Sequence, residues 1–307
     1  MDYLLISSYQ IRHSARVFLW LIFCIFSVQT QAAIVAIDED VVIDYYKFIG
    51  QRNPLHIKSY TGPHSRRDVI ELLLLLQILD AGGFKEKVEL LKQNSYRRTL
   101  SMIRTGDALA YGTPAWSGDV SNNHESYWVS KEMIRSNEFL VGAYTSEDNL
   151  LALSANAKNF SALSAVSSKQ WRVDWNILQS LRVKALHNAT SWPRMIKMVG
   201  AQRVDFTLSP FYPSPSMKIT RDDITLVPIP NIRISMGESR LWVVSRKHPD
   251  SEAMQLAITK GMAKFRQQGT IVRAYTESGF FDPRVKNWKV LNPDTVAQLS
   301  SNASNGE

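Results

Sequence analysis

The sequence has a single cysteine, Cys24, among its 307 residues. A disulfide framework within the chain is therefore excluded, and a hydrophobic core has to stabilise the fold. An apolar run of membrane-spanning length is also absent. Residues 17–28 fall short of the roughly twenty residues that a spanning helix needs, and the Leu-rich residues 71–79 are interrupted by Gln77. We expect a soluble mature chain of roughly 275 residues, which is enough for two lobes.

Catalytic and cofactor-binding motifs are lacking as well. No G-x-S-x-G, P-loop or dinucleotide-binding fingerprint occurs. The histidines are widely spaced, without a pair at metal-ligand spacing; they are His13, His56, His64, His124, His187 and His248. We therefore expect no enzyme, no cofactor and no metal.

Charge of one sign is not concentrated anywhere. The chain has 36 basic and 28 acidic residues and a net charge of +8, but no more than two basic residues are adjacent. A nucleic-acid-binding protein would gather its basic residues into a patch or stripe. The scattered charge indicates a solvated, mildly basic surface and no nucleic-acid partner, while an anionic ligand stays open.

The N-terminal segment is typical of an exported protein. Arg12 and Arg16 precede the apolar run, and Thr30 and Ala32 are small residues at the positions that a signal peptidase reads. We predict a signal peptide over residues 1–32, cleavage after Ala32 and a periplasmic location. An uncleaved membrane anchor is the alternative.

After this segment, strand-like runs alternate with amphipathic helical stretches, which is typical of α/β folds with parallel sheets. In the first half we predict strands over residues 55–60, 87–93 and 108–112, with helices over 65–82 and 95–106. A second unit repeats this order, with strands over residues 138–145, 160–166, 183–188 and 203–211 and helices over 167–181 and 190–200. Strands over 224–230 and 239–247 and helices over 248–269 and 270–281 follow. The polar residues 295–307 are expected to be a disordered tail.

Three of these segments together resemble a known family. They are residues 239–280 (SRLWVVSRKHPDSEAMQLAITKGMAKFRQQGTIVRAYTESGF), residues 97–116 (RRTLSMIRTGDALAYGTPAW) and residues 195–210 (MIKMVGAQRVDFTLSP). In this order they resemble the bacterial extracellular solute-binding proteins of family 3, the periplasmic receptors of polar amino-acid ABC transporters. The resemblance covers nearly the whole mature chain and identifies it as a diverged member.

The resemblance implies a two-lobe, type II periplasmic-binding-protein fold, with a mainly parallel sheet flanked by helices in each lobe and a ligand cleft between them. It implies a first lobe of residues 33–137 and 236–294 and a second lobe of residues 138–235, with residues 138–145 and 232–238 as crossovers. The expected function is capture of a small polar solute, an amino acid or related molecule, by a monomer that serves an inner-membrane ABC permease. A ligand sensor that signals to a membrane sensor kinase is one alternative, and a dehydratase-like enzyme on the same fold is another.

The sequence departs from the family at one element. Family members carry Thr-x-x-x-Arg after the third strand, and that arginine pairs with the ligand's carboxylate. Here the corresponding residues 113–133 contain no arginine. Arg240 at the return crossover is a candidate substitute for the missing charge.

Ligands of α/β folds gather at the carboxyl ends of the strands, where helix N-termini also offer free N–H groups. This rule selects candidate ligand-binding residues that follow the predicted strands. They are Tyr60, Thr61, Thr113, Trp116, Ser167, Ser168, Asn188, Thr190, Ser191, Ser209 and Phe211, and Arg240 is added for its charge. For the serines and threonines, ordinary N-capping is the alternative role.

Overall fold

The computed structural model describes residues 32–293. The described residues 33–293 belong to one compact unit. The predicted signal peptide and the predicted C-terminal tail lie outside the described residues. No helix in the described part is long and apolar enough to cross a membrane.

The first sheet has the strand order β2-β1-β3-β14-β5. Its strands are β1 (Ala33–Asp38), β2 (Val88–Gln93), β3 (Ala110–Tyr111), β5 (Tyr127–Val129) and β14 (Val243–Ser245). β1 is parallel to both β2 and β3, whereas β14 is antiparallel to β3 and β5. The sheet therefore has a parallel half, β2-β1-β3, and an antiparallel half, β14-β5. β14 is the strand that brings the chain back to this sheet at residue 243.

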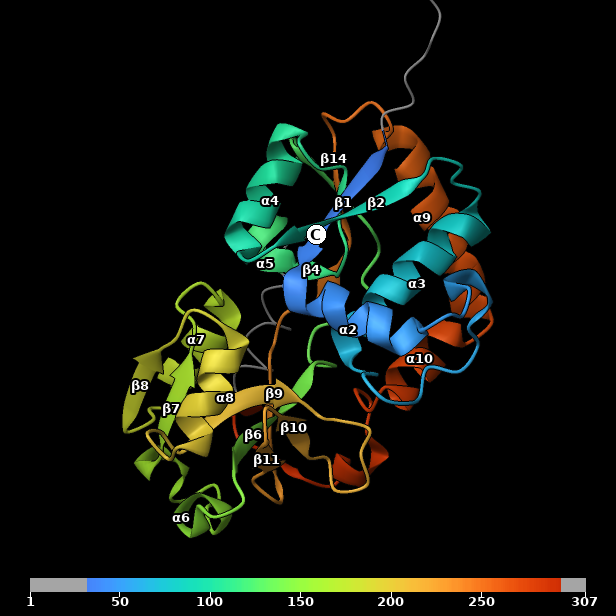
Figure 1. Cartoon of the computed structure of the whole chain (residues 1–307). Coiled ribbons are helices and arrows are strands. Elements are labelled where there is room, and N and C mark those ends of the chain that lie inside the picture. The colour runs from blue at the N-terminus through green and yellow to red at the C-terminus, as the bar shows by residue number, and fades with distance from the viewer. Residues whose placement is uncertain (1–31, 294–307) are drawn as a thin grey trace, which may run out of the picture. The chain divides into compact units, whose positions relative to one another are not determined.

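Helices cover both faces of this sheet (Figure 1). They are α2 (Glu39–Ile49), α3 (Arg67–Gly82), α4 (Tyr96–Thr105), α5 (Ser117–Val120), α9 (Ser251–Gln267) and α10 (Thr270–Glu277). Alternate residues of β1 enter two different cores, since Val35 and Ile37 pack with α3 and α9 while Ala36 packs with Leu100 and Ile103 of α4. The alternation follows from the two-residue period of a strand. We call this sheet and its helices the first lobe.

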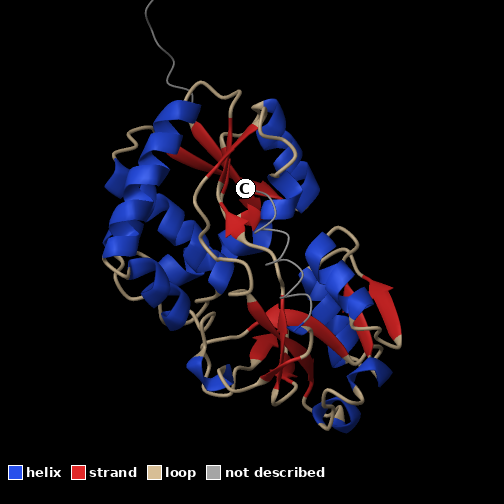
Figure 2. Cartoon of the chain, turned by 180° about the vertical axis from the view of Figure 1, so that it is seen from behind, coloured by secondary structure: helices blue, strands red, loops and turns tan. Residues whose placement is uncertain are grey.

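The second sheet follows the order β10-β11-β6-β9-β7-β8, with β12 also paired to β6. Its strands are β6 (Leu140–Ser146), β7 (Ser164–Ser167), β8 (Ala185–Asn188), β9 (Phe206–Pro210), β10 (Ile219–Arg221), β11 (Ile224–Pro228) and β12 (Ile232–Ser235). β7 is parallel to β8 and β9, whereas β6 is antiparallel to β9, β11 and β12, so the sheet is mixed rather than mainly parallel as expected. The helices beside it are α6 (Leu150–Leu153), α7 (Arg172–Ser180) and α8 (Trp192–Gly200). We call this sheet and its helices the second lobe; Figure 2 shows the helices and strands of both lobes from behind.

The chain passes between the lobes at paired strands. β6 and β12 run antiparallel, with Val141 opposite Ile234. A short pair beside them joins β4 (Ala115–Trp116) to β13 (Arg240–Leu241), and β15 (Lys289–Val290) adds to β12. The lobe boundaries at residues 137 and 235 stay a prediction.

One predicted strand is wrong. Pro54–His56 form a 3-10 helix, and residues 57–60 belong to no strand. The alternating residues of this segment are held by other contacts, since Gln77 of α3 donates to the carbonyls of Pro54 and Ile57. The first strand is β1, which lies directly after the predicted cleavage point.

Candidate functional site

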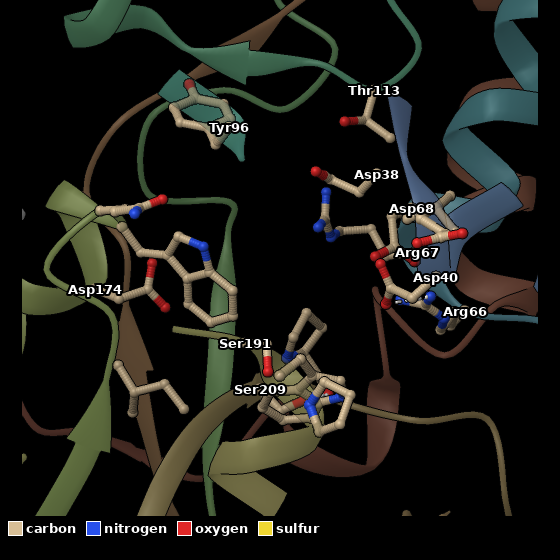
Figure 3. A pocket seen from close by; sticks show the side chains of 18 of the residues that line it. Asp38, Asp40, Arg66, Arg67, Asp68, Tyr96, Thr113, Asp174, Ser191 and Ser209 are labelled. Carbon is tan, nitrogen blue, oxygen red and sulfur yellow. Dashed lines mark hydrogen bonds and ion pairs between the residues drawn. The ribbon is translucent and has the colours of Figure 1, made fainter. Parts of the chain in front are cut away.

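A cavity of about 750 Å³ is lined by residues of both lobes (Figure 3). It opens where parallel strands end, beside Asp38 at the end of β1 and Ser209 near the end of β9. The N-termini of α3 and α8 reach the same space through Arg67 and Ser191. This is the location where α/β folds bind ligands, so the cavity is the candidate binding site.

Arg66 lines the cavity but already has its counter-charges. Its guanidinium contacts carboxylates of Asp40 at 3.0 Å, Asp44 at 3.1 Å and Asp68 at 2.6 Å. These ion pairs use three of the five N–H donors of the guanidinium and more than balance its charge. Arg66 therefore ties α2 to the start of α3 and has little capacity left for a solute.

The neighbouring Arg67 is held by a different, deeper group. Its Nη1 lies 2.6 Å from the Glu71 carboxylate one helical turn on, and the Glu71 side chain is 0% exposed. The hydroxyl of Tyr275 from α10 donates to the other Glu71 oxygen at 3.1 Å. In Figure 3, Arg67 extends its guanidinium toward the cavity near Asp38.

Asp38 is the acidic residue at the end of β1. It accepts a hydrogen bond of 2.7 Å from the Tyr111 hydroxyl. Burial raises the pKa of Asp38 from its ordinary value of 3.8 to about 6, and the Tyr111 bond offsets only part of that rise. A carboxylate in this environment gains from any cationic or hydrogen-bond-donating group that enters the cavity.

Arg240 on β13 is the most buried arginine of the cavity, at 7% exposure. Its guanidinium carbon lies 4.7 Å from the centre of the Trp116 ring and 5.6 Å from that of Phe139. Nη2 donates to the carbonyl of Pro114. Burial lowers the pKa of Arg240 from its ordinary value.

The second lobe contributes Asp174, in the first turn of α7, from the opposite side of the cavity (Figure 3). Burial raises the pKa of Asp174 from 3.8 to about 6, although Arg240 and Arg67 lower it through their charges. Ser191 caps α8 without a side-chain hydrogen bond, and Thr190 accepts one from Arg194 at 2.8 Å. Charged groups therefore face the cavity from both lobes.

The structure brings seven of the predicted ligand-binding residues together around the cavity. They are Thr113, Trp116, Thr190, Ser191, Ser209, Phe211 and Arg240. The other five do not line it: Tyr60, Thr61, Ser167, Ser168 and Asn188. Tyr60 is buried against α3, where its hydroxyl donates to Gln77 at 2.9 Å, and Asn188 accepts from the backbone of Lys169 at 2.9 Å.

Sequence reasoning missed the charged residues of the cavity, chiefly Asp38, Arg67 and Asp174. Asp38 was overlooked because β1 was not recognised, although its sequence AIVAID is a continuous apolar run typical of a buried strand. Arg67 and Asp174 lie in the first turns of helices, where surface charges are common, and only the fold shows that they face a cavity.

The raised pKa of Asp174 predicts a pH-dependent stability. Because the folded-state pKa of about 6 lies above the ordinary 3.8, the ionised carboxylate opposes folding, and stability falls as pH rises from about 4 to 6. Asp174→Asn should therefore raise the free energy of unfolding by about 2 kcal/mol at pH 7.5 and change little at pH 4. Urea unfolding at both pH values measures this.

Asp205 is a matched control with the opposite sign. Hydrogen bonds from Ser164 and Asn149 hold its pKa below the ordinary value. Its ionised form favours folding, so Asp205→Asn should destabilise the protein at pH 7.5 and lose this effect as pH falls below about 4. Equal effects of the two variants at both pH values would contradict the assignment.

An ion-pair network joins the two lobes at one side of the cavity. Arg172 of α7 contacts Asp119 of α5 at 2.6 Å and holds both oxygens of Glu238 at 2.6 and 2.7 Å. Glu238 lies between β12 and β13, and it also accepts from the backbone N–H of Gly118 at 3.1 Å. A bidentate guanidinium pair of this kind is a strong, directional contact.

Removing this network should let the lobes separate. Arg172→Met keeps the aliphatic packing but no charge, and we expect a roughly tenfold fall in the ratio of closed to open molecules. Small-angle scattering and label-to-label distances should report a more extended molecule. Lys218→Met, which breaks a pair with Glu147 inside the second lobe, is the control and should leave the distances unchanged.

Among residues 32–293, no group of three or more His, Cys, Asp or Glu side chains is arranged around one point. No protein-family model matches the chain, and no curated protein matches it either. Solved structures do match. AbpA, an amino acid ABC transporter substrate-binding protein from Streptococcus pneumoniae bound to L-arginine, is 13% identical, with a TM-score of 0.51 over 81% of this chain and 96% of its own.

Two further structures have comparable scores. The GluR0 ligand-binding core in complex with L-glutamate is 10% identical, with a TM-score of 0.51 over 81% of this chain and 99% of its own. The periplasmic domain of BvgS from B. pertussis is 12% identical, with a TM-score of 0.53 over 95% of this chain and 48% of its own.

The chain has the type II periplasmic-binding-protein fold. The expected α/β class with two lobes is confirmed, and the fold occurs both in single receptors and within longer periplasmic chains.

Proposed function

We propose that the protein is a periplasmic solute-binding protein, a diverged relative of family 3, which captures a small polar solute between its lobes. The observation that carries this proposal is the cavity of about 750 Å³, which both lobes line with charged and hydroxyl groups. Its volume suits a small molecule. The similarity of fold to AbpA, whose structure holds L-arginine, supports an amino acid or a related compound as the solute.

Closure on the solute follows from where these groups lie. Asp38 and Arg240 belong to the first lobe, whereas Asp174 and Ser191 belong to the second. A solute therefore makes its full set of contacts only when the lobes are close together, and binding favours that arrangement. The Arg172 network stabilises the same arrangement without solute.

A thermal-shift screen of the exported protein against amino acids, organic acids and short peptides tests the proposal. A solute present at a hundred times its dissociation constant should add about 2.7 kcal/mol of stability. Cavity variants such as Trp116→Ala should reduce that gain. If no compound in the screen stabilises the protein, or if stabilisation survives every cavity substitution, solute capture in this cavity is ruled out.

Delivery to an ABC permease is the proposed use of the bound solute, and signalling to a membrane sensor kinase is the second candidate. The match to the BvgS periplasmic domain, which covers 95% of this chain and about half of that one, favours keeping this second candidate. Solute uptake by cells with and without the gene separates the two. Loss of uptake supports transport, and unchanged uptake with a changed transcriptional response supports sensing.

A further inference from the structure

The cavity wall contains more positive than negative charge at one point. Arg67 and Arg240 lie beside the same aromatic ring, with guanidinium carbons 5.2 and 5.6 Å from the centre of Phe139. Glu71 pairs with Arg67 at 2.6 Å. Within residues 32–293, no carboxylate lies within ion-pair distance of Arg240. Within ion-pair distance the two guanidinium groups thus have one carboxylate between them, and Asp174 acts on both from further away.

These two arginines also have N–H donors that lack acceptors. The Nε atoms of both Arg67 and Arg240 are buried and have no partner in the described part of the chain. In Arg240, only Nη2 has an acceptor there, the carbonyl of Pro114. An unpaired buried donor on a charged group is unfavourable, and such groups are retained mainly where a ligand completes them.

Arg240 is held in the cavity wall by the residues around it. It lies on β13, directly opposite Trp116 of β4, and its side chain stacks at 4.7 Å from the Trp116 ring. The backbone of Ile134 also pairs with that of Arg240. The guanidinium is therefore fixed in the cavity wall at 7% exposure. Its Nε is itself inaccessible, so Nη1, which has no acceptor in the described chain, is the donor left for the cavity.

We propose that Arg240 is the oxyanion-binding residue of this cavity, and that the captured solute carries a carboxylate or phosphate group that lies against it. This rests on the proposed function. Arg67 adds a second positive charge to the same wall, and Trp116 covers one face of the guanidinium. Arg66 does not compete for the anion because three carboxylates already surround it.

The position explains how an oxyanion is held without an arginine in residues 113–133. β4 and β13 are hydrogen-bonded neighbours, so a guanidinium on β13 reaches the space beside Thr113 and Trp116 from the adjacent strand. Because Nη2 is bonded to the Pro114 carbonyl and Nε is buried, Nη1 is the nitrogen that would donate to the oxyanion, and the fixed guanidinium plane sets the direction of its N–H groups, which a lysine does not do.

Calorimetric titration with paired probes tests the proposal. The carboxylate probes are L-arginine, L-glutamate and succinate, each compared with its primary amide; the phosphate probe is O-phospho-L-serine, compared with L-serine. In the wild-type protein we expect at least one acid to bind about a hundredfold more tightly than its uncharged partner. If the affinity ratio is largest for an acid over its amide, the bound group is a carboxylate. If it is largest for O-phospho-L-serine over L-serine, the bound group is a phosphate. Equal affinity within every pair would overturn the proposal while leaving solute capture intact.

Variants assign the effect to Arg240. Arg240→Gln should abolish the difference between acid and amide, and Arg240→Lys should lose about tenfold in affinity for the acid. Arg233→Gln is the matched control, because Arg233 on β12 also has a buried, unpartnered Nε but does not line the cavity. Retention of the full acid preference by Arg240→Lys and Arg240→Gln would overturn the assignment. If Arg240→Gln does not fold, the lysine variant decides alone. Absence of binding by every probe would count against the proposed function itself.

Discussion

Gly261→Ala is expected to destabilise the protein by about 3 kcal/mol, which corresponds to a fall in Tm on the order of 5–10 °C. Gly261 lies in α9 where this helix crosses α3, and a methyl group there would meet the carbonyl oxygen of Ile78 at 2.0 Å. Because the obstacle is backbone, no side-chain rotation relieves the clash and the two helices have to move apart. Alanine's higher helix propensity recovers only about 1 kcal/mol.

Gly82 gives an independent check on the same crossing. A methyl group at Gly82 would meet the carbonyl oxygen of Ala257 at 1.9 Å, so Gly82→Ala should be destabilising to a similar extent. Lys260→Ala is the control, since Lys260 is exposed on α9 and its replacement should change the unfolding free energy by less than about 0.5 kcal/mol. Wild-type stability in both glycine variants would show that the helices do not approach this closely.

The regular elements could be predicted where their sequence signals were local. α8 begins at Trp192 with Pro193 in its first turn, and α4 ends at Gly106, which has the left-handed φ of 93° that favours glycine. The return of the chain to the first sheet through β14 also follows the predicted strand over 239–247. In these places the local sequence alone is enough to predict the element.

Other features depended on contacts that a sequence does not display. Residues 55–60 alternate like a strand, yet no strand of the sheet lies beside them, and Gln77 of α3 takes up their carbonyls. The first strand, β1, follows directly after the predicted signal peptide; its apolar run AIVAID is typical of a buried strand, but the predicted strands begin only at residue 55.

The candidate site divides in the same way. Thr113, Trp116 and Ser209 follow predicted strands, and the rule on strand ends was enough to select them. Tyr60 was selected by the same rule applied to a strand that does not exist. The charge on Arg67 and Asp174 gave no indication of position, because only the packing of α3 and α7 turns these residues toward the cavity.

Glu71→Ala is expected to cost about 3–5 kcal/mol of unfolding free energy, because it removes the one carboxylate of the described chain that lies within ion-pair distance of either buried guanidinium, Arg67 or Arg240. Glu71 is 0% exposed, and the Arg67 side chain that it pairs with is 13% exposed. Without Glu71, neither Arg67 nor Arg240 would have a carboxylate within ion-pair distance in the described chain, and only the more distant Asp68 and Asp174 would offset their charge. The Tyr275 hydroxyl would also lose its acceptor. Chemical unfolding at neutral pH and low salt measures the loss.

Two further variants separate the charge of Glu71 from its hydrogen bond. Glu71→Gln keeps the volume and an oxygen acceptor for Tyr275 but carries no charge, so it should lose most of what Glu71→Ala loses. Tyr275→Phe removes only the hydroxyl and should cost about 1 kcal/mol. If Glu71→Gln were instead as stable as the wild-type protein, the carboxylate would contribute through shape and hydrogen bonding alone. The positive charge of Arg67 and Arg240 would then not need an anion, and this result would also weaken the argument that the cavity binds one.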